Sequence, residues 1–143
     1  NEHQKDWPLR KLEEELWNLE GKTVAVLGLS FKPETDDLRF APSLEIVAKL
    51  QAHGVKVAAY DPVAMPKART LLANVRFAKD AYDAVTGADC LMLVTEWKAF
   101  QGLDFAKVKR LMRHPIVLDG RNFFDAAALK ALGFTYRGVG RAA

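Results

Sequence analysis

The sequence contains a single cysteine, Cys90, in 143 residues, so no disulfide can form within the chain. No apolar run approaches the roughly 20 residues that a membrane-spanning helix needs. The first five residues lack the apolar stretch of a signal peptide, and the sequence does not begin with methionine. These absences argue against a secreted or membrane protein, and we expect a cytoplasmic fragment of a longer protein.

Excess charge is also modest, because 21 lysines and arginines against 18 acids give a formal net charge of +3. Residues 1–20 hold six of the acids and three of the bases, which leaves +6 for the rest of the chain. That balance fits a modestly anionic ligand and falls short of a nucleic-acid footprint. The best candidate for a basic stripe is a predicted helix, and a solvated helix face explains its bases more simply, so we expect no nucleic-acid partner. These bases are Lys107, Lys109, Arg110 and Arg113.

Residues 1–20 carry leucines at spacings of three and four, which predicts a helix with one apolar side. The leucines are Leu9, Leu12, Leu16 and Leu19. Pro8 suits the first turn of this helix and Gly21 suits its end. The helix either packs on the domain that follows or belongs to a larger interface.

From residue 21 onward, short apolar runs alternate with helical stretches. Strands are predicted at 23–27, 55–60, 90–94 and 116–118, with shorter ones at 75–77 and 134–136. Helices are predicted from Pro42 to the residue before Gly54, and near 63–73, 80–87, 104–113 and 125–132. Several of the strands are apolar throughout, as strands buried on both faces of a parallel sheet are. We therefore predict an α/β fold over residues 21–143, with a Rossmann-like, doubly wound, mostly parallel sheet.

Ligands of such a sheet bind at the carboxyl ends of its strands, where the strand order reverses. The loop after the first strand lacks the G-x-G-x-x-G fingerprint of a dinucleotide site, because Ser30 and Pro33 stand where glycines are needed. It carries Lys32 and Arg39 instead, and Arg121 follows the strand at 116–118. Together these bases favour phosphate binding. Taken singly, each could be solvated or paired with Asp36, Asp37 or Asp119.

Other candidate residues favour structural roles. Cys90 begins an apolar strand, which indicates a buried, inert thiol. The three histidines show no metal-ligand spacing; His53 is expected to cap a helix end and His114 to lie in a turn. We expect Asp36 and Asp37 to be helix caps or partners of a helix dipole rather than a metal-binding pair. Asp61 is expected in a turn rather than on a ribose. Trp97 and Phe100 could pack a helix against the sheet or stack on a base. The sequence thus predicts neither a metal site nor a catalytic residue.

Several segments share their form with one known family: Asn1–Lys5, Gly21–Arg39 with its F-K-P-E-T-D-D-L-R string, Ala41–Ser43, Tyr60–Pro62, Thr95–Trp97 and Asp119–Asn122. They resemble the carboxyl-terminal domain of the UDP-glucose and GDP-mannose dehydrogenases, and the resemblance covers essentially the whole chain. Within the family, the form of these motifs is most similar to that of the UDP-glucose 6-dehydrogenases. Such enzymes oxidise UDP-glucose to UDP-glucuronate with two NAD, and they bind NAD mainly through an amino-terminal domain that this chain does not include.

The resemblance also implies residue roles. Phe31, Lys32 and Arg121 are implied as contacts to the substrate, and Arg39 as a residue that reaches the NAD of the other domain. Residues 1–20 are implied as the end of a central helical region, and the parent as a homo-oligomer. The family's nucleophilic cysteine has no counterpart here, so the isolated chain is expected to be inactive. Two alternatives stay open: a relative that uses GDP-mannose or a UDP-N-acetylhexosamine, and a non-enzymatic module that binds a phosphorylated metabolite.

Overall fold

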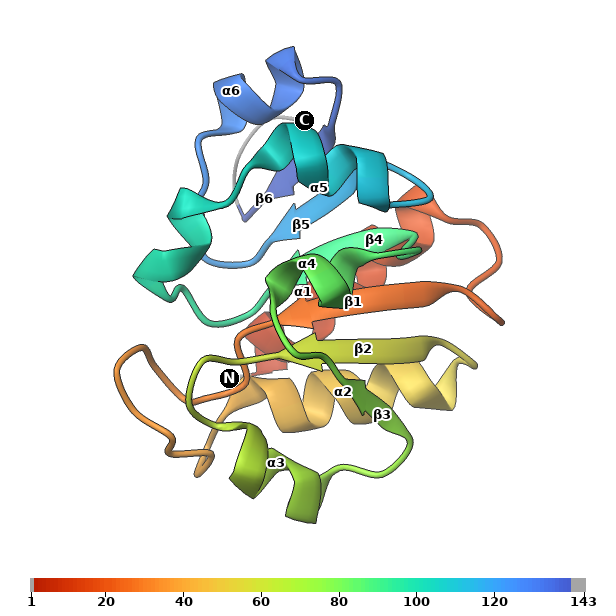
Figure 1. Ribbon diagram of the computed structural model, residues 1–143. Helices are drawn as coiled ribbons and strands as arrows, with labels where there is room; N and C mark the ends of the chain where they lie inside the picture. The colour runs from red at the N-terminus through yellow and green to blue at the C-terminus, as the bar shows by residue number, and fades with distance from the viewer. Residues whose placement is uncertain (1, 140–143) are drawn as a thin grey trace.

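Six parallel strands form one sheet with helices on both of its faces (Figure 1). The structure is a computed structural model that describes residues 2–139, with side chains from residue 6 onward. The strand order is β3-β2-β1-β4-β5-β6, and all neighbouring pairs are parallel. The strands are β1 (Thr23–Leu27), β2 (Lys56–Tyr60), β3 (Val75–Phe77), β4 (Cys90–Leu93), β5 (Ile116–Asp119) and β6 (Thr135–Gly138). The predicted doubly wound, Rossmann-like fold is confirmed.

The first helix precedes β1, and the others connect successive strands, as the alternation in the sequence predicts. The helices are α1 (Glu2–Glu15), α2 (Pro42–Ala52), α3 (Met65–Leu71), α4 (Ala81–Val85), α5 (Phe105–Leu111) and α6 (Ala126–Ala131), with a 3₁₀ turn, η1 (Lys98–Gly102), after β4. The predicted helices occur at the expected places, and η1 was not expected. None of the helices within residues 2–139 is long and apolar enough to cross a membrane.

Two apolar layers hold the sheet between the helices. Successive strand residues point to opposite faces, so Val24 and Val26 of β1 pack with α1 and α2, whereas Ala25 and Leu27 pack with α4, α5 and α6. The inner strands β4 and β5 are buried at every position. Burial on both faces explains why these strands read as continuous apolar runs.

The leading helix packs on the domain, and its limits differ from those predicted. Pro8 lies inside α1 instead of in its first turn, and α1 ends at Glu15, six residues before Gly21. The leucine spacing continues past this end because Leu16 and Leu19 are buried in an irregular segment that packs on the same core. Gly21, at φ +78°, forms the turn into β1 instead of ending the helix.

Ion pairs fix α1 to two other elements of the domain. Arg137 of β6 reaches both Glu15, at 2.6 Å, and Glu14, at 2.9 Å, and Lys49 of α2 pairs with Asp6. Together with the buried leucines, these pairs confirm that the helix packs on the domain that follows it.

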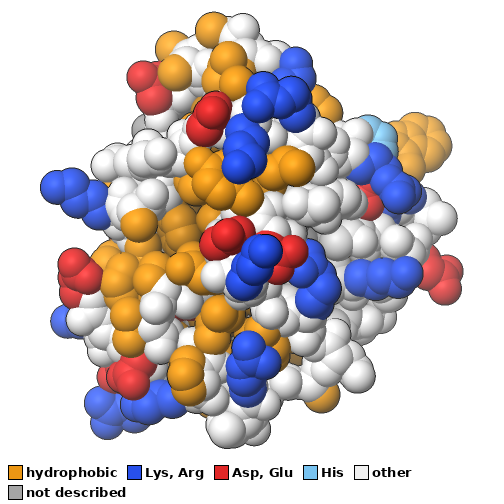
Figure 2. All heavy atoms as spheres, in the orientation of Figure 1, with side chains coloured by type: hydrophobic (Ala, Val, Ile, Leu, Met, Phe, Trp, Pro, Cys, Tyr) orange, Lys and Arg blue, Asp and Glu red, His pale blue; other side chains and the backbone are white. Residues whose placement is uncertain are grey.

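On the face of the molecule that Figure 2 shows, Lys and Arg side chains lie among acidic and hydrophobic ones, and some of them adjoin one another. Two bases of the predicted basic helix have local partners. Lys107 lies over the ring of Tyr82 at 4.4 Å, and Lys109 donates to the carbonyl of Leu132 at 2.9 Å. Lys107 and Lys109 thus have neighbours within the domain.

Candidate functional site

The strand order reverses between β1 and β4, because β1 pairs with β2 on one side and with β4 on the other. Ligands of open α/β sheets bind outside the carboxyl ends of the strands at this point. The loops that meet there follow β1, β2, β4 and β5. Two buried carboxylates, Asp61 after β2 and Asp119 at the end of β5, hold these loops in place.

Asp61 joins three of the loops. It is 1% exposed, and its carboxylate accepts five hydrogen bonds. The donors are the backbone N–H groups of Leu29 (2.7 Å), Ser30 (3.0 Å), Val63 (2.9 Å) and Ala64 (2.8 Å), and the indole N–H of Trp97 (3.1 Å). The bonds to Val63 and Ala64 confirm the turn role predicted for Asp61. Its contacts to the loops after β1 and β4 were not foreseen.

The aromatic residues after β4 serve packing. Trp97 is 6% exposed and donates its indole N–H to Asp61, and Phe100 is 1% exposed in the same core layer. Neither ring therefore has a face open for a base to stack on.

The loop after β1 approaches the loop after β4 closely. Gly28 has φ +91°, and a Cβ atom there would lie 2.5 Å from the backbone oxygen of Thr95. The hydroxyl of Thr95 donates to the carbonyl of Ser30 at 2.6 Å, and the hydroxyl of Ser43 donates to that of Leu29 at 2.5 Å. The start of the loop thus has little freedom to move.

Phe31 and Lys32 lie on the exposed part of this loop. The Phe31 side chain is half-exposed, and its backbone N–H donates to the carbonyl of Asp37 at 2.7 Å. The backbone carbonyl of Lys32 accepts a hydrogen bond of 2.8 Å from the Ser30 hydroxyl. The Lys32 ammonium is exposed, and among residues with described side chains it has no acidic partner. This loop therefore presents a cation that no described acid pairs with, on backbone that hydrogen bonds hold in place.

Arg121 reaches the same edge from the loop after β5. Its backbone N–H donates to Asp119 at 3.1 Å, and its guanidinium pairs with Glu96 at 3.1 Å. The ion pair considered for Arg121 thus exists with Glu96 and not with Asp119. The reason is that Asp119 is fully buried and its oxygens already accept from the backbone of the loop and from the hydroxyl of Tyr136.

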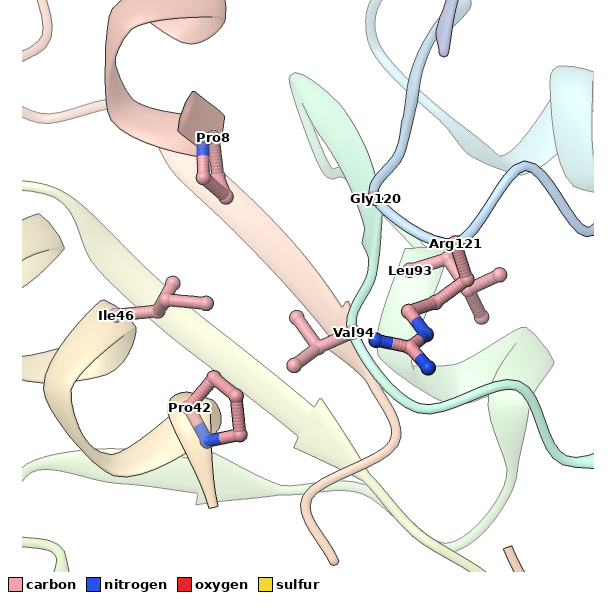
Figure 3. A pocket seen from close by; sticks show the side chains of 7 residues that line it. All are labelled: Pro8, Pro42, Ile46, Leu93, Val94, Gly120 and Arg121. Carbon is pink, nitrogen blue, oxygen red and sulfur yellow. The ribbon is translucent and has the colours of Figure 1, made fainter. Parts of the chain in front are cut away.

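A small cavity of about 20 Å³, open to solvent, lies beside Arg121 at this edge (Figure 3). Its walls come from α1, α2 and the ends of β4 and β5, and Arg121 is the charged side chain among them. The lining residues are Pro8, Pro42, Ile46, Leu93, Val94, Gly120 and Arg121. Pro8 makes α1 part of this wall, which the sequence did not reveal.

Arg39 lies in a different cavity, together with Lys67 of α3. Its guanidinium pairs with Asp37 at 3.0 Å, which confirms the ion-pair alternative for this base. The hydrogen bond from Arg39 lowers the pKa of Asp37 from 3.8 to about 2. Asp36 pairs with Lys67 at 3.2 Å. The expectation that the two acids cap a helix is wrong, because α2 begins at Pro42. The residue that caps α2 is Ala41, and neither aspartate is at its end.

The remaining candidates have structural roles. Cys90 is fully buried in β4, and burial raises the pKa of its thiol. His53 caps α2, as expected, and its Nδ1 lies 2.9 Å from the carbonyl oxygen of Lys49. His114, before β5, contacts the buried Asp89 at 2.9 Å. No group of three or more potential metal ligands occurs among the residues described.

The comparison with known proteins agrees with this geometry. A family model described as the UDP binding domain of the UDP-glucose/GDP-mannose dehydrogenase family matches residues 25–126. The chain is 49% identical over 129 residues to a UDP-glucose 6-dehydrogenase of Pseudomonas aeruginosa, in an alignment that covers 85% of this chain and 28% of the relative. It is 39% identical over 144 residues to one of Bacillus subtilis, covering 100% of this chain and 31% of the relative.

A solved structure extends the similarity to three dimensions. The UDP-glucose dehydrogenase of Pyrobaculum islandicum superposes with a TM-score of 0.84 at 34% identity, over 99% of this chain and 31% of that one. The chain thus spans less than a third of the length of each of these three relatives. The resemblance expected from the loop sequences is confirmed, and the chain belongs to the UDP-glucose/GDP-mannose dehydrogenase family, as its UDP binding domain.

Proposed function

We propose that this domain binds the nucleotide part of UDP-glucose at the carboxyl edge of its sheet. The proposal rests on one observation: the loop after β4 contacts both the loop that holds Lys32 and the loop that holds Arg121. Thr95 of that loop bonds to Ser30, beside Lys32, and the next residue, Glu96, pairs with Arg121. Two cations held at the point where the strand order reverses suit a diphosphate.

Each proposed contact suits a different part of the ligand. The Lys32 ammonium is a compact charge for a phosphate oxygen, with no acidic partner among the described side chains, and the Arg121 guanidinium keeps donors that Glu96 does not use. The half-exposed ring of Phe31 offers an apolar surface to the base or the sugar. Arg39 lies in the separate cavity and is proposed to reach NAD held by another part of the protein.

The whole protein, by this proposal, oxidises UDP-glucose to UDP-glucuronate with two NAD. This domain contributes binding and no catalytic residue, because its one cysteine is buried and unsuited to act as a nucleophile. The nucleophile and the main NAD site then lie in parts of the protein outside this chain. We also propose that the protein is cytoplasmic and a homo-oligomer, with residues 1–20 ending its central helical region and residues 21–143 forming this domain.

A thermal-shift titration of the chain with UDP, UDP-glucose, GDP and NAD tests the binding proposal. A ligand that binds only the folded state raises the Tm, and by more the further its concentration exceeds its Kd. We expect UDP and UDP-glucose to raise the Tm and GDP and NAD to have little effect. A double variant, Lys32→Ala with Arg121→Ala, should lose the shift. Stabilisation by NAD alone, or an equal UDP shift in the double variant, would contradict the proposal.

A further inference from the structure

In dinucleotide-binding sheets of this topology, two features close to β1 and β2 hold the cofactor. Backbone N–H groups in the turn after β1 bind the pyrophosphate, and an acid after β2 binds the ribose. This chain has both features, in the turn at residues 28–30 and in Asp61. Here they bind each other, since Asp61 Oδ2 accepts from the N–H groups of Leu29 and Ser30 at 2.7 and 3.0 Å.

The surroundings of Asp61 resemble those of a bound anion. Among residues with described side chains, no lysine, arginine or histidine forms an ion pair with it, although it is 1% exposed. Five N–H donors surround its two oxygens instead. Rings of N–H groups of this kind are the usual surroundings of a bound anion in proteins. The donors of the β1 turn are therefore already occupied, and the turn does not fit a dinucleotide pyrophosphate.

We propose that Asp61 acts as a built-in anion in place of a cofactor phosphate. It closes the β1 turn to dinucleotides, and it is a positioning residue for the loop that carries Phe31 and Lys32. The second part rests on the proposed function, because only that function makes the two side chains ligand contacts. The first part concerns the turn alone.

Hydrogen bonds lead from Asp61 to the proposed contacts in two steps. Asp61 fixes the backbone N–H of Ser30, and the Ser30 hydroxyl donates to the carbonyl of Lys32 at 2.8 Å. From the other side, Asp61 holds the indole of Trp97, two residues after Thr95, whose hydroxyl donates to the Ser30 carbonyl. Loss of the carboxylate should thus release Ser30 and move the Lys32 backbone with it.

The experiment compares Asp61→Ala with Asp89→Ala in two-dimensional amide NMR spectra and in UDP titrations. Asp89 is a matched control because it is also buried, at 2% exposure, and accepts a backbone hydrogen bond of 2.9 Å, from Thr23. It precedes β4 and so lies at the opposite edge of the sheet. Each variant is measured in sodium formate and in sodium chloride of equal ionic strength, since formate has the size and charge of the carboxylate removed.

In chloride, Asp61→Ala should shift and broaden the amide signals of Phe31 and Lys32 and weaken UDP binding about tenfold, the usual effect of losing a hydrogen bond to a charged group. Formate should return both the signals and the affinity toward those of the unsubstituted chain. Asp89→Ala should lose stability but keep both loop signals and the affinity. Unchanged Phe31 and Lys32 signals in a folded Asp61→Ala variant, or no response to formate, would overturn the proposal.

A second variant and spectra without ligand separate a failure of this proposal from a failure of the proposed function. If Asp61→Ala does not fold, Asp61→Asn keeps the side-chain shape but turns one acceptor into a donor, so the same loop signals should shift without rescue by formate. The amide signals of the loop are measured without ligand, so they test the role of Asp61 whether or not the chain binds UDP. Failure of the unsubstituted chain to bind UDP would refute the proposed function only. Binding of NAD to the unsubstituted chain with displaced Leu29 and Ser30 amide signals would refute the closed turn.

Discussion

Nε and Nη2 of Arg121 both lie 3.1 Å from the same carboxylate oxygen of Glu96. The guanidinium is therefore held along one edge, and its Nη1 takes no part in this pair. Glu96 follows Thr95, which bonds to the loop after β1, so the pair joins the loops after β1, β4 and β5. An arginine oriented in this way can receive a phosphate without first giving up its acidic partner.

Arg121→Ala should weaken UDP binding by about 1–3 kcal/mol, the range for a charge-assisted hydrogen bond. Arg121→Lys should fall between the two, because lysine keeps the charge and loses the planar fork. Isothermal titration calorimetry measures both effects. Arg113→Ala is the matched control, since Arg113 is exposed and lies before β5, at the opposite edge of the sheet. Equal affinity in the Arg121 and Arg113 variants would remove Arg121 from the site.

Lys32→Ala should weaken UDP binding by a similar amount, about 1–3 kcal/mol, and leave the free energy of unfolding within about 0.5 kcal/mol. Stability is spared because the ammonium is exposed and pairs with no described acid. Calorimetry and urea denaturation separate the two effects. Lys56→Ala removes an exposed charge at the start of β2, on the far edge, and should change neither. A loss of stability in Lys32→Ala that accounts for its weaker binding would contradict the assignment.

The sequence predicts the sheet well for a physical reason. β4 and β5 are buried on both faces, so burial requires an unbroken apolar run that is visible without any tertiary information. Pro8 shows the limit of local rules, because its place inside α1 follows from where the helix packs and not from its own preference for a first turn.

The candidate site is predictable only in part. The bases Lys32, Arg39 and Arg121 stand out because they follow predicted strands. The carboxylate that holds their loops does not stand out, since Asp61 bonds to Leu29 across 32 positions of the chain. An acid directly after a strand is the available signal, and it indicates a turn equally well. Which loops such an acid joins depends on the strand order, which local patterns leave open.

Gly28→Ala should lower the free energy of unfolding by about 3 kcal/mol or more, because it adds a clash to an unfavourable backbone conformation. The new Cβ would lie 2.5 Å from the backbone of Thr95, at φ +91°. Gly87→Ala isolates the conformational cost, since Gly87 has φ +76° and open space around it. That control should lose only about 1 kcal/mol. Urea denaturation compares the two, and equal losses would show that the loops separate easily.

Cys90 should not react with a water-soluble disulfide reagent in the native chain at pH 8 and should react once the chain is unfolded. Burial removes access to the thiol and raises its pKa, so little thiolate forms. Absorbance of the released thiolate follows the reaction. In the whole protein, Cys90→Ser should cost stability but keep turnover nearly intact. Rapid labelling of the folded chain, or loss of turnover in a well-folded variant, would contradict an inert thiol.

The pair between Arg39 and Asp37 should survive far into the acid range. Its hydrogen bonds lower the pKa of Asp37 from 3.8 to about 2 in the folded chain. A lowered carboxyl pKa stabilises the fold above the unfolded value of 3.8, and this contribution is lost as the pH falls toward 2. A carbon-13 NMR titration of the side-chain carboxyl measures the midpoint directly.

Two variants identify the cause of that low pKa. Arg39→Ala should raise the pKa of Asp37 part of the way toward 3.8, because it removes the side-chain hydrogen bond, the largest cause of the shift, and keeps the backbone one. Lys67→Ala should move it much less, since Lys67 acts on Asp37 only through its charge and is the smallest of the causes. High salt should reduce the effect of Lys67 more than that of Arg39, because screening weakens charge interactions without direct contact first. Equal shifts in the two variants would mean that general positive charge, and not the bond to Arg39, holds Asp37 ionised.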